Sequence, residues 1–313
     1  MTHKLLLGAA LGALFAVGAS APSRAEESYI PLISKGFQHQ FWQAVKLGAE
    51  QAAKQANVKI TFEGPETEAM VDKQIDMLSA ALAKKPSAIG FAALDSKAAI
   101  PLLKKAHDAK MPVIAFDSGV DSDIPLTTCT TDNVAAAGLA ADKMAQAIGD
   151  AGEVGVVVHD QTSRTGIDRR DGFLNQMKAK HPNIKVIDVQ YGGGDHLKSA
   201  EIAKTMLQAH PNLKGIFGAN EGSAEGVAIG VKESGKKVVI IGYDSGKEQK
   251  DAIRSGAMYG AITQNPIGIG KCTVEEAVKA LKGETLPKVV DTGFYWYDKS
   301  NIDDPKVAAV LYD

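Results

Sequence analysis

The sequence predicts an α/β protein built from two Rossmann-like lobes, each with a parallel sheet, and three observations favour this class. Short apolar or β-branched runs alternate with amphipathic segments of helical length, the pattern of a parallel sheet covered by helices on both faces. The alternation stops and restarts near the middle of the chain. The length of 313 residues fits two domains at ~100–200 residues each.

The first series of elements begins with a strand at 29–34. A helix at 41–56 follows, because Phe41, Val45 and Ala49 recur at helical spacing. The same reasoning then predicts a strand at 58–62, a helix at 71–82, a strand at 88–93, a helix at 97–109 and a strand at 112–116.

The second series repeats the order and lengths of the first. Strands are predicted at 154–158, 184–189, 213–219 and 238–242, with helices at 167–179, 197–209 and 223–232 between them. The repeat is clearest where the segment 116–119 (FDSG) matches 243–246 (YDSG), each directly after a predicted strand. Two similar domains are therefore expected.

Composition and charge exclude several function classes. Hydrophobic residues make up 45% of the chain and charged residues 23%, which is ordinary for a globular protein. With 35 Lys plus Arg against 37 Asp plus Glu, the net charge of −2 leaves no electrostatic footprint for nucleic acid or an anionic membrane. The two Cys and seven His are dispersed, so neither a metal site nor a cofactor is expected.

The first 25 residues are predicted to be a secretory signal peptide. Lys4 precedes an apolar run at 5–19, and Ser23 and Ala25 occupy the small-residue positions of a cleavage site. Cleavage after Ala21 is the alternative. The run is short for a transmembrane helix, so we expect a soluble protein outside the cytoplasm.

Polar residues that follow the predicted strands are candidates for a binding cleft. Ligands of open α/β sheets bind outside the carboxyl ends of the strands, where Asp117 and Asp244 stand in both repeats. An Asp at such a turn also caps helices, and that alternative stays open. Asn220 follows a third strand, and Gln264 ends the run that starts at residue 259.

The loop after the first strand is dense in polar and aromatic residues. It holds Lys35 and His39 and leads into Phe41 and Trp42. A ring here suits stacking on the C–H face of a sugar. The alternative is a core role, but adjacent helix positions face different ways, so at least one of the two rings is expected in the cleft.

Together these residues resemble the periplasmic sugar-binding proteins of ABC transporters, in the ribose, galactose and xylose cluster and most closely those for ribose. The matching segments are Phe41-Trp42, 112–117 (PVIAFD), 131–133 (TDN), 169–173 (RRDGF), 209–211 (AHP) with Asn220, 242–244 (GYD) and 264–266 (QNP). The resemblance implies a type I fold, two lobes joined by a three-strand hinge that close over one small ligand. It also implies an ABC permease in the inner membrane as partner.

The resemblance carries the sugar-contacting roles to specific positions. It implies that Phe41 and Trp42 stack on the ligand ring, and that hydroxyl partners follow at Asp117, Asn220, Asp244 and Gln264. Tyr243 takes the aromatic position beside the second aspartate. Carboxylates that accept hydrogen bonds from neighbouring hydroxyls suit a polyhydroxylated ligand.

Several positions depart from the ribose-binding pattern. Lys35 and His39 stand where ribose binders carry Ser and Asn, and Ser118 stands where they carry an Arg. A second ligand Arg aligns with Ile167, and an aromatic residue aligns with Gly194.

These departures argue against ribose as the ligand. Lys35 is a candidate replacement for a lost charge, and the loop offers Arg164 or Arg169, although an Arg169 salt bridge within its own lobe is the alternative. The missing aromatic at Gly194 is expected to enlarge the site for a hexose, a polyol or a branched sugar, and a sugar acid stays open.

The match also predicts the domain organisation. Lobe one is expected to combine residues 26–128 with 265–290, and lobe two 129–264 with 291–313. Cys129 lies at a crossing and Cys272 on a following helix. An exported protein permits a disulfide between them, but the sequence does not give their separation, so pairing stays open.

The predicted function is a non-enzymatic receptor that captures a monosaccharide or related polyol and delivers it to an ABC importer. A monomer is expected, with a chemoreceptor as a further partner. The alternatives are a sensor for a sugar-like signalling molecule, a glycoside hydrolase using the two aspartates, and a sugar-responsive repressor. The repressor is disfavoured because no basic helix-turn-helix precedes the lobes.

Overall fold

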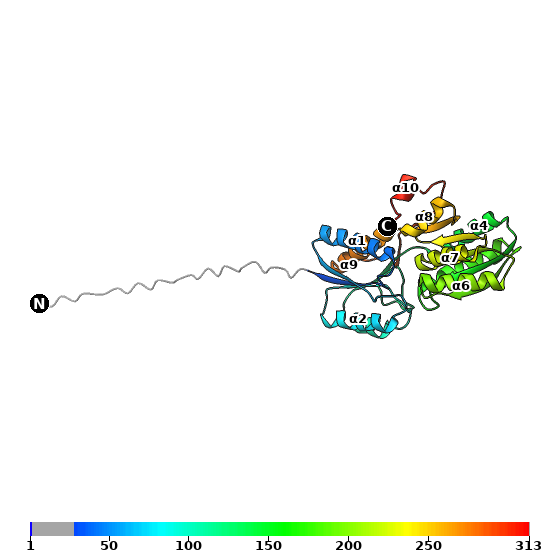
Figure 1. The fold of residues 1–313 in the computed structure, drawn as a ribbon. Coiled ribbons are helices and arrows are strands. Elements are labelled where there is room, and N and C mark those ends of the chain that lie inside the picture. The colour runs from blue at the N-terminus through cyan, green and yellow to red at the C-terminus, as the bar shows by residue number, and fades with distance from the viewer. Residues whose placement is uncertain (2–27, 313) are drawn as a thin grey trace.

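The computed structural model describes residues 28–312, together with Met1. Two α/β lobes lie side by side, each built on a six-stranded sheet (Figure 1), which confirms the predicted fold class. The predicted signal peptide lies outside the described residues. Within the described part of the chain, none of the helices combines the length and apolar character needed to cross a membrane.

The first sheet has the strand order β11-β5-β4-β3-β1-β2, and all its pairings are parallel. Its strands are β1 (Tyr29–Ile33), β2 (Lys59–Glu63), β3 (Ile89–Phe91), β4 (Val113–Phe116), β5 (Thr127–Thr130) and β11 (Val289–Asp291). Helices α1 (Gln40–Ala56) and α9 (Pro266–Leu281) cover one face, and α2 (Val71–Ala83) and α3 (Ile100–Asp108) cover the other (Figure 1).

The second sheet has the order β12-β10-β9-β8-β6-β7, and only its β12 pairing with β10 is antiparallel among the described strands. Its strands are β6 (Gly152–Val158), β7 (Ile184–Tyr191), β8 (Leu213–Gly218), β9 (Val239–Tyr243), β10 (Gly260–Gln264) and β12 (Phe294–Asp298). Helices α4 (Asn133–Ile148) and α5 (Arg164–Lys180) cover one face. The other face carries α6 (His196–Ala209), α7 (Glu221–Ser234), α8 (Lys247–Ser255) and α10 (Pro305–Ala308).

Each sheet is buried on both faces, which explains why its strands are apolar runs. Every residue of β4 is buried, as are Ile30 to Ile33 of β1. On one face of the first sheet, α1 and α9 pack so closely that a Cβ at Gly270 would lie 1.9 Å from the Val45 carbonyl oxygen. A glycine is therefore required for this helix packing.

The chain crosses between the lobes three times, and the three crossing segments lie side by side. They follow β5, β10 and β11. Thr292 N donates to Thr130 O over 2.9 Å, and Asn265 Nδ2 donates to Thr292 O over 3.2 Å. These bonds make the three crossings one hydrogen-bonded hinge. The lobe boundaries within it stay a prediction, with β5 extending to Thr130 in the first sheet.

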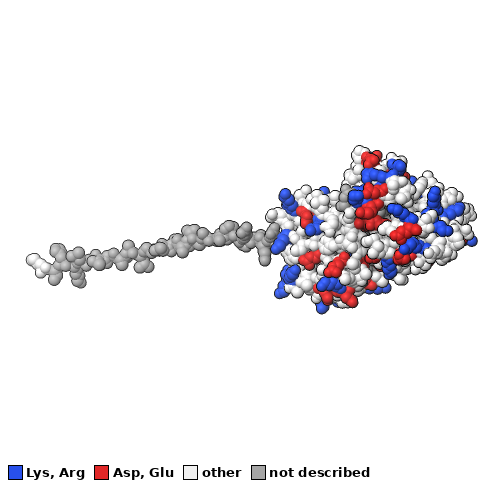
Figure 2. Space-filling view, in the orientation of Figure 1, with Lys and Arg blue, Asp and Glu red and all other residues white. Residues whose placement is uncertain are grey.

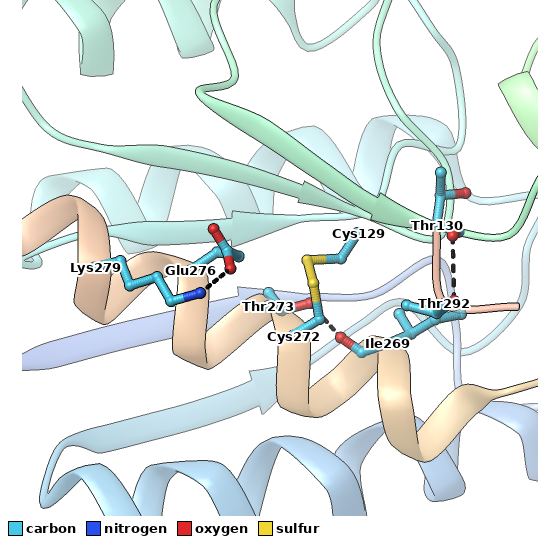
Figure 3. Close-up of a disulfide and its surroundings, with 8 residues drawn as sticks. All are labelled: Cys129, Thr130, Ile269, Cys272, Thr273, Glu276, Lys279 and Thr292. Carbon is cyan, nitrogen blue, oxygen red and sulfur yellow. Dashed lines mark hydrogen bonds and ion pairs between the residues drawn. A yellow bond between two sulfur atoms is a disulfide. The ribbon is translucent and has the colours of Figure 1, made fainter. Parts of the chain in front are cut away.

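A disulfide joins Cys129 of β5 to Cys272 of α9, with their Cα atoms 6.0 Å apart (Figure 3). The sequence left this pairing open because it does not give the distance in space between two residues that lie 143 positions apart. The fold brings them together, since α9 packs against β4 and β5 directly after the second crossing. The disulfide therefore lies in the core of lobe one, beside the hinge.

The surface is electrostatically mixed. On the face in view, acidic and basic side chains are interspersed over both lobes (Figure 2). This distribution agrees with the near-neutral net charge of −2.

Candidate functional site

A small cavity lies between the lobes, where the carboxyl ends of strands from both sheets face each other. Every predicted site residue except Ser118 and Tyr243 lines it. The lining consists of Lys35, His39, Phe41, Trp42, Glu68, Asp117, His159, Thr165, Arg169, Asn220, Asp244 and Gln264.

The two aspartates of the internal repeat occupy equivalent backbone positions. Asp117 follows β4 with φ 54°, and Asp244 follows β9 with φ 77°, both in the left-handed region. Each backbone N–H donates to a neighbouring segment, from Asp117 to Cys129 O over 2.8 Å and from Asp244 to Ile262 O over 2.6 Å. Non-glycine residues adopt this conformation sparingly, and it concentrates at functional sites. The repeat therefore presents a carboxylate to the cavity from each lobe.

The Asp117 carboxylate accepts no hydrogen bond from the described residues, although its side chain is almost fully buried. Burial raises the pKa of Asp117 to about 7, against the opposing effects of Lys35 and Arg169. A carboxylate without a protein partner at the wall of a cavity is free to accept hydrogen bonds from a ligand.

The Asp244 carboxylate is held by the protein. Its Oδ1 accepts from Gln264 Nε2 over 2.7 Å, and its Oδ2 accepts from Glu221 N over 3.0 Å. Gln264 Oε1 in turn accepts from Thr131 Oγ1 over 2.9 Å, next to the hinge. These bonds fix the orientation of both side chains toward the cavity.

Arg169 enters the cavity, whereas Arg164 does not. The Arg169 guanidinium lies 3.8 Å from the centre of the Tyr243 ring, and its Nε donates to Asn133 Oδ1 over 2.8 Å. Its Nη1 lies 3.8 Å from Asp244 Oδ2. Burial would lower the pKa of Arg169, but its surroundings raise it above the ordinary value, so it stays charged.

Arg164 instead lies at the rim of the cleft. It pairs with Asp168 on its own helix and with Asp121 of the other lobe, 3.6 Å away. The sequence left open which of the two arginines reaches the site, and Arg169 lines the cavity. The alternative for Arg169, an ion pair within its own lobe, is also present, because Asp244 belongs to the same lobe.

Tyr243 and Ser118 lie outside the cavity, contrary to the prediction. Tyr243 points to the α4 side of its sheet, where it supports Arg169 and donates to Asn133 Oδ1 over 3.0 Å. Ser118 is fully buried, and its Oγ has no hydrogen-bond partner. The left-handed turn at Asp117 directs that one side chain into the cavity and turns the next residue away from it.

A buried ion pair forms the wall of the cavity in lobe one. Lys35 Nζ lies 3.4 Å from Glu68 Oε2 and donates to Thr165 Oγ1 of lobe two over 3.2 Å. Burial would lower the pKa of Lys35, but the nearby carboxylates, Glu68 foremost, raise it. Burial would raise the pKa of Glu68, but Lys35 and the hydrogen bond from Trp42 lower it to about 2. Both partners are therefore charged.

Phe41 and Trp42 contribute both to the cavity wall and to the core, two roles that the sequence left as alternatives. Both line the cavity, and both belong to the core of lobe one. Their rings meet edge to face with centroids 5.0 Å apart, and Trp42 Nε1 donates to Glu68 Oε1 over 2.8 Å. The wall they form is thus fixed before any ligand arrives.

The space beside Gly194 is occupied, so the predicted enlargement of the site does not occur there. A Cβ at Gly194 would lie 3.3 Å from nitrogen atoms of Gln38, His39 and Asn220. Gln38 Nε2 also donates to the Gly194 carbonyl across the cleft over 3.1 Å. Asn220 Oδ1 caps its own helix by accepting from Ser223 N over 2.9 Å, which leaves its amide nitrogen facing this region.

Three lining residues were absent from the prediction: Glu68, His159 and Thr165. His159 directly follows β6, so the strand-end rule that identified Asp117 could have found it. Glu68 lies in the loop before α2, and Thr165 lies in the first turn of α5. No strand-end signal marks those two. Among the described residues, no group of three or more His, Cys, Asp or Glu could hold a metal ion.

Known proteins resemble the chain over most of its length. A family model described as "Periplasmic binding protein domain" matches residues 30–285. The D-allose-binding periplasmic protein of Escherichia coli is 28% identical over 82% of this chain and 86% of its own length.

Two crystal structures resemble the chain in both fold and sequence. A carbohydrate transporter solute-binding protein from Agrobacterium radiobacter in complex with D-arabinose has a TM-score of 0.88 and 33% identity, covering 92% of this chain and 99% of its own. An ABC transporter solute-binding protein from Agrobacterium vitis bound with α-D-tagatopyranose has a TM-score of 0.87 and 35% identity. It covers 92% of this chain and 100% of its own.

Proposed function

The chain belongs to the periplasmic binding protein domain family, and on that premise we propose that it captures a monosaccharide or related polyol between its lobes and delivers it to an ABC importer. The observation that carries the proposal is the interlobe cavity, in which an unpartnered carboxylate at Asp117 faces fixed polar groups and a preformed aromatic wall.

The chemistry of the lining suits neighbouring hydroxyl groups. The Asp117 carboxylate accepts two hydrogen bonds from adjacent hydroxyls, and such charge-assisted bonds are about twice as strong as neutral ones. The Asn220 amide nitrogen offers a donor on the opposite lobe. Phe41 and Trp42 supply an apolar surface for the C–H face of a ring.

The charge of the cavity narrows the ligand class further. Lys35 is neutralised by Glu68, and Arg169 lies near Asp244. Because both cations have protein carboxylates beside them, the site favours a neutral sugar or polyol over a sugar acid.

The proposed activity is binding without turnover. The Asp244 carboxylate is engaged by Gln264 and by the backbone of Glu221. It is therefore suited to orienting a hydroxyl rather than to proton transfer. We further propose export to the periplasm, a monomeric state, and docking on an inner-membrane permease, with a chemoreceptor as a second partner.

A thermal-shift screen against pentoses, hexoses, polyols and sugar acids tests the proposal. A ligand at 100 times its dissociation constant stabilises the native state by ~2.7 kcal/mol. At ~2–4 °C per kcal/mol, the melting temperature should rise by ~5–10 °C. D-arabinose and D-tagatose are the first probes, and Asp117→Asn is the matched variant that should lose the shift. Absence of any shift with every sugar and polyol would refute the proposal.

A further inference from the structure

Helix α1, whose first residues form the aromatic wall, begins without a cap of its own. Its N-cap residue, His39, makes no side-chain capping bond, and the first turn holds no acidic residue. The first N–H groups of a helix have no partner within the helix and need an external acceptor. For α1 that acceptor comes from the other lobe.

Glu221, the first residue of α7 in lobe two, caps α1 across the cleft. Its Oε1 accepts from Gln40 N over 2.8 Å, and its Oε2 accepts from Phe41 N over 3.1 Å. The donors and the acceptor are 181 and 180 positions apart in the sequence. A carboxylate at this end of a helix also interacts favourably with the helix dipole.

The Glu221 carboxylate is held in place from its own side. The side chain is 3% exposed, and Tyr312 near the chain end donates to its Oε2 over 3.0 Å. The Glu221 backbone N–H donates to Asp244 Oδ2. Glu221 is thus linked to a cavity residue without lining the cavity itself.

The capping is reciprocal. Helix α8 of lobe two also lacks a side-chain cap, because its N-cap residue is Gly246. Gln40 of lobe one supplies the acceptor, and its Oε1 accepts from Lys247 N over 2.8 Å. Two helices that begin uncapped in their own lobes therefore receive their caps from each other's lobe.

We propose that Glu221 and Gln40 form a reciprocal helix cap that sets the closing equilibrium, and through it the affinity for every ligand alike. The capping bonds join opposite lobes, so lobe separation breaks them and returns the N–H groups to water. Neither side chain lines the cavity, so neither selects among ligands. The part of this inference that concerns affinity rests on the proposed function, because it is tested with a sugar. The part that concerns lobe closure does not.

The variants Glu221→Gln and Gln40→Ala test the cap, with Glu233→Gln as the matched control. Glu233 lies on the same helix, and its carboxylate pairs with Lys204 of α6 over 3.0 Å, within lobe two. Glu221→Gln removes the charge and puts an amide NH₂ where an acceptor is needed. A lost N-cap corresponds to about tenfold in an equilibrium constant.

The first measurement needs no ligand. Small-angle X-ray scattering and amide exchange at Gln40, Phe41 and Lys247 should show Glu221→Gln more open and less protected than wild type, with Glu233→Gln unchanged. Equal scattering and equal protection in Glu221→Gln and wild type would overturn the proposal, whatever the ligand proves to be.

The second measurement is calorimetric titration with each sugar that shifts the melting temperature. Glu221→Gln should weaken all of them by the same factor, about tenfold, and leave the ratios between sugars as in wild type. A loss that differs from sugar to sugar would overturn the proposal, because it would make Glu221 a ligand contact. If no sugar binds the wild type, the proposed function fails, and the scattering and exchange results still decide the cap.

Discussion

Breaking the disulfide between Cys129 and Cys272 should destabilise lobe one far more than lobe two. The bond closes a loop of 143 residues that contains strands β6 to β10. In the chain-entropy treatment, the cross-link stabilises the native state by ~5 kcal/mol when the whole loop unfolds and by ~3 kcal/mol when lobe two stays folded inside it, because fewer flexible residues then separate the two cysteines. At ~2–4 °C per kcal/mol, reduction should lower the melting temperature of lobe one by ~6–20 °C.

The chain contains two tryptophans, and the fold places one in each lobe. Trp42 lies in the core of lobe one, and Trp296 packs against the core of lobe two. Guanidinium titrations of Trp296→Phe and Trp42→Phe, oxidised and reduced, therefore report on each lobe separately. Cys129→Ala with Cys272→Ala provides a thiol-free comparison.

The Trp42 signal should shift to lower denaturant on reduction, and the Trp296 signal should shift less. The oxidised and reduced forms of the wild-type protein differ only in the S–S bond, because both keep the two sulfur atoms in the core. Their comparison therefore measures the effect of the cross-link alone. A Trp42 midpoint that stays in place while a thiol assay shows both cysteines free would refute the reasoning. So would equal shifts of the two signals.

Three further predictions concern charged groups. Asp117→Asn should weaken sugar binding by ~100-fold in calorimetry, because loss of a buried charged partner costs ~2–5 kcal/mol; unchanged affinity would remove Asp117 from the site. Lys35→Met should destabilise the fold by ~3–5 kcal/mol by leaving Glu68 charged and unpaired. Adding Glu68→Gln should recover most of that loss, and a strictly additive double variant would contradict the pairing. Two aspartates raise the pKa of the His181 imidazole above its ordinary value, against the effect of burial. Its stabilising effect should be full below ~pH 6.5 and fade as the pH rises through the raised pKa, so the melting temperatures of wild type and His181→Asn should converge in alkali.

The sequence predicted the elements that carry a strong local pattern and missed those that depend on partners. Predicted helices and strands such as 41–56 and 184–189 correspond to α1 and β7 within a few residues. Helix α4 escaped prediction because its buried face is mostly alanine, which contrasts weakly with its polar positions. Strand β11 has three residues and exists through its pairing with β5, information that no local window contains.

The same distinction applies to the site. Asp117 and Asp244 were predictable because the ends of parallel strands always meet at one edge of a sheet. Glu68 was not, because its place beside Lys35 depends on the path of a loop. Thr165 was not, because its bond to Lys35 forms only where two lobes meet. The missed residues are those positioned by tertiary structure rather than by a repeated local motif.

The contacts between the lobes separate the determinants of affinity from those of selectivity. Besides the reciprocal cap, Ser96 N donates to Thr162 O across the opposite rim over 3.0 Å, and Arg164 Nη1 lies 3.6 Å from Asp121 Oδ1. The apparent affinity of a receptor falls in proportion to the fraction of molecules that are closed, so each such contact raises the affinity for any ligand. These contacts are hydrogen bonds and ion pairs, which water replaces at modest net cost when the cleft opens. A large apolar contact in their place would hold the lobes shut without a ligand. Because the contacts at the rims are polar, they stabilise the closed state only modestly over the open state. The free energy of ligand binding in the cavity then determines whether the lobes stay closed.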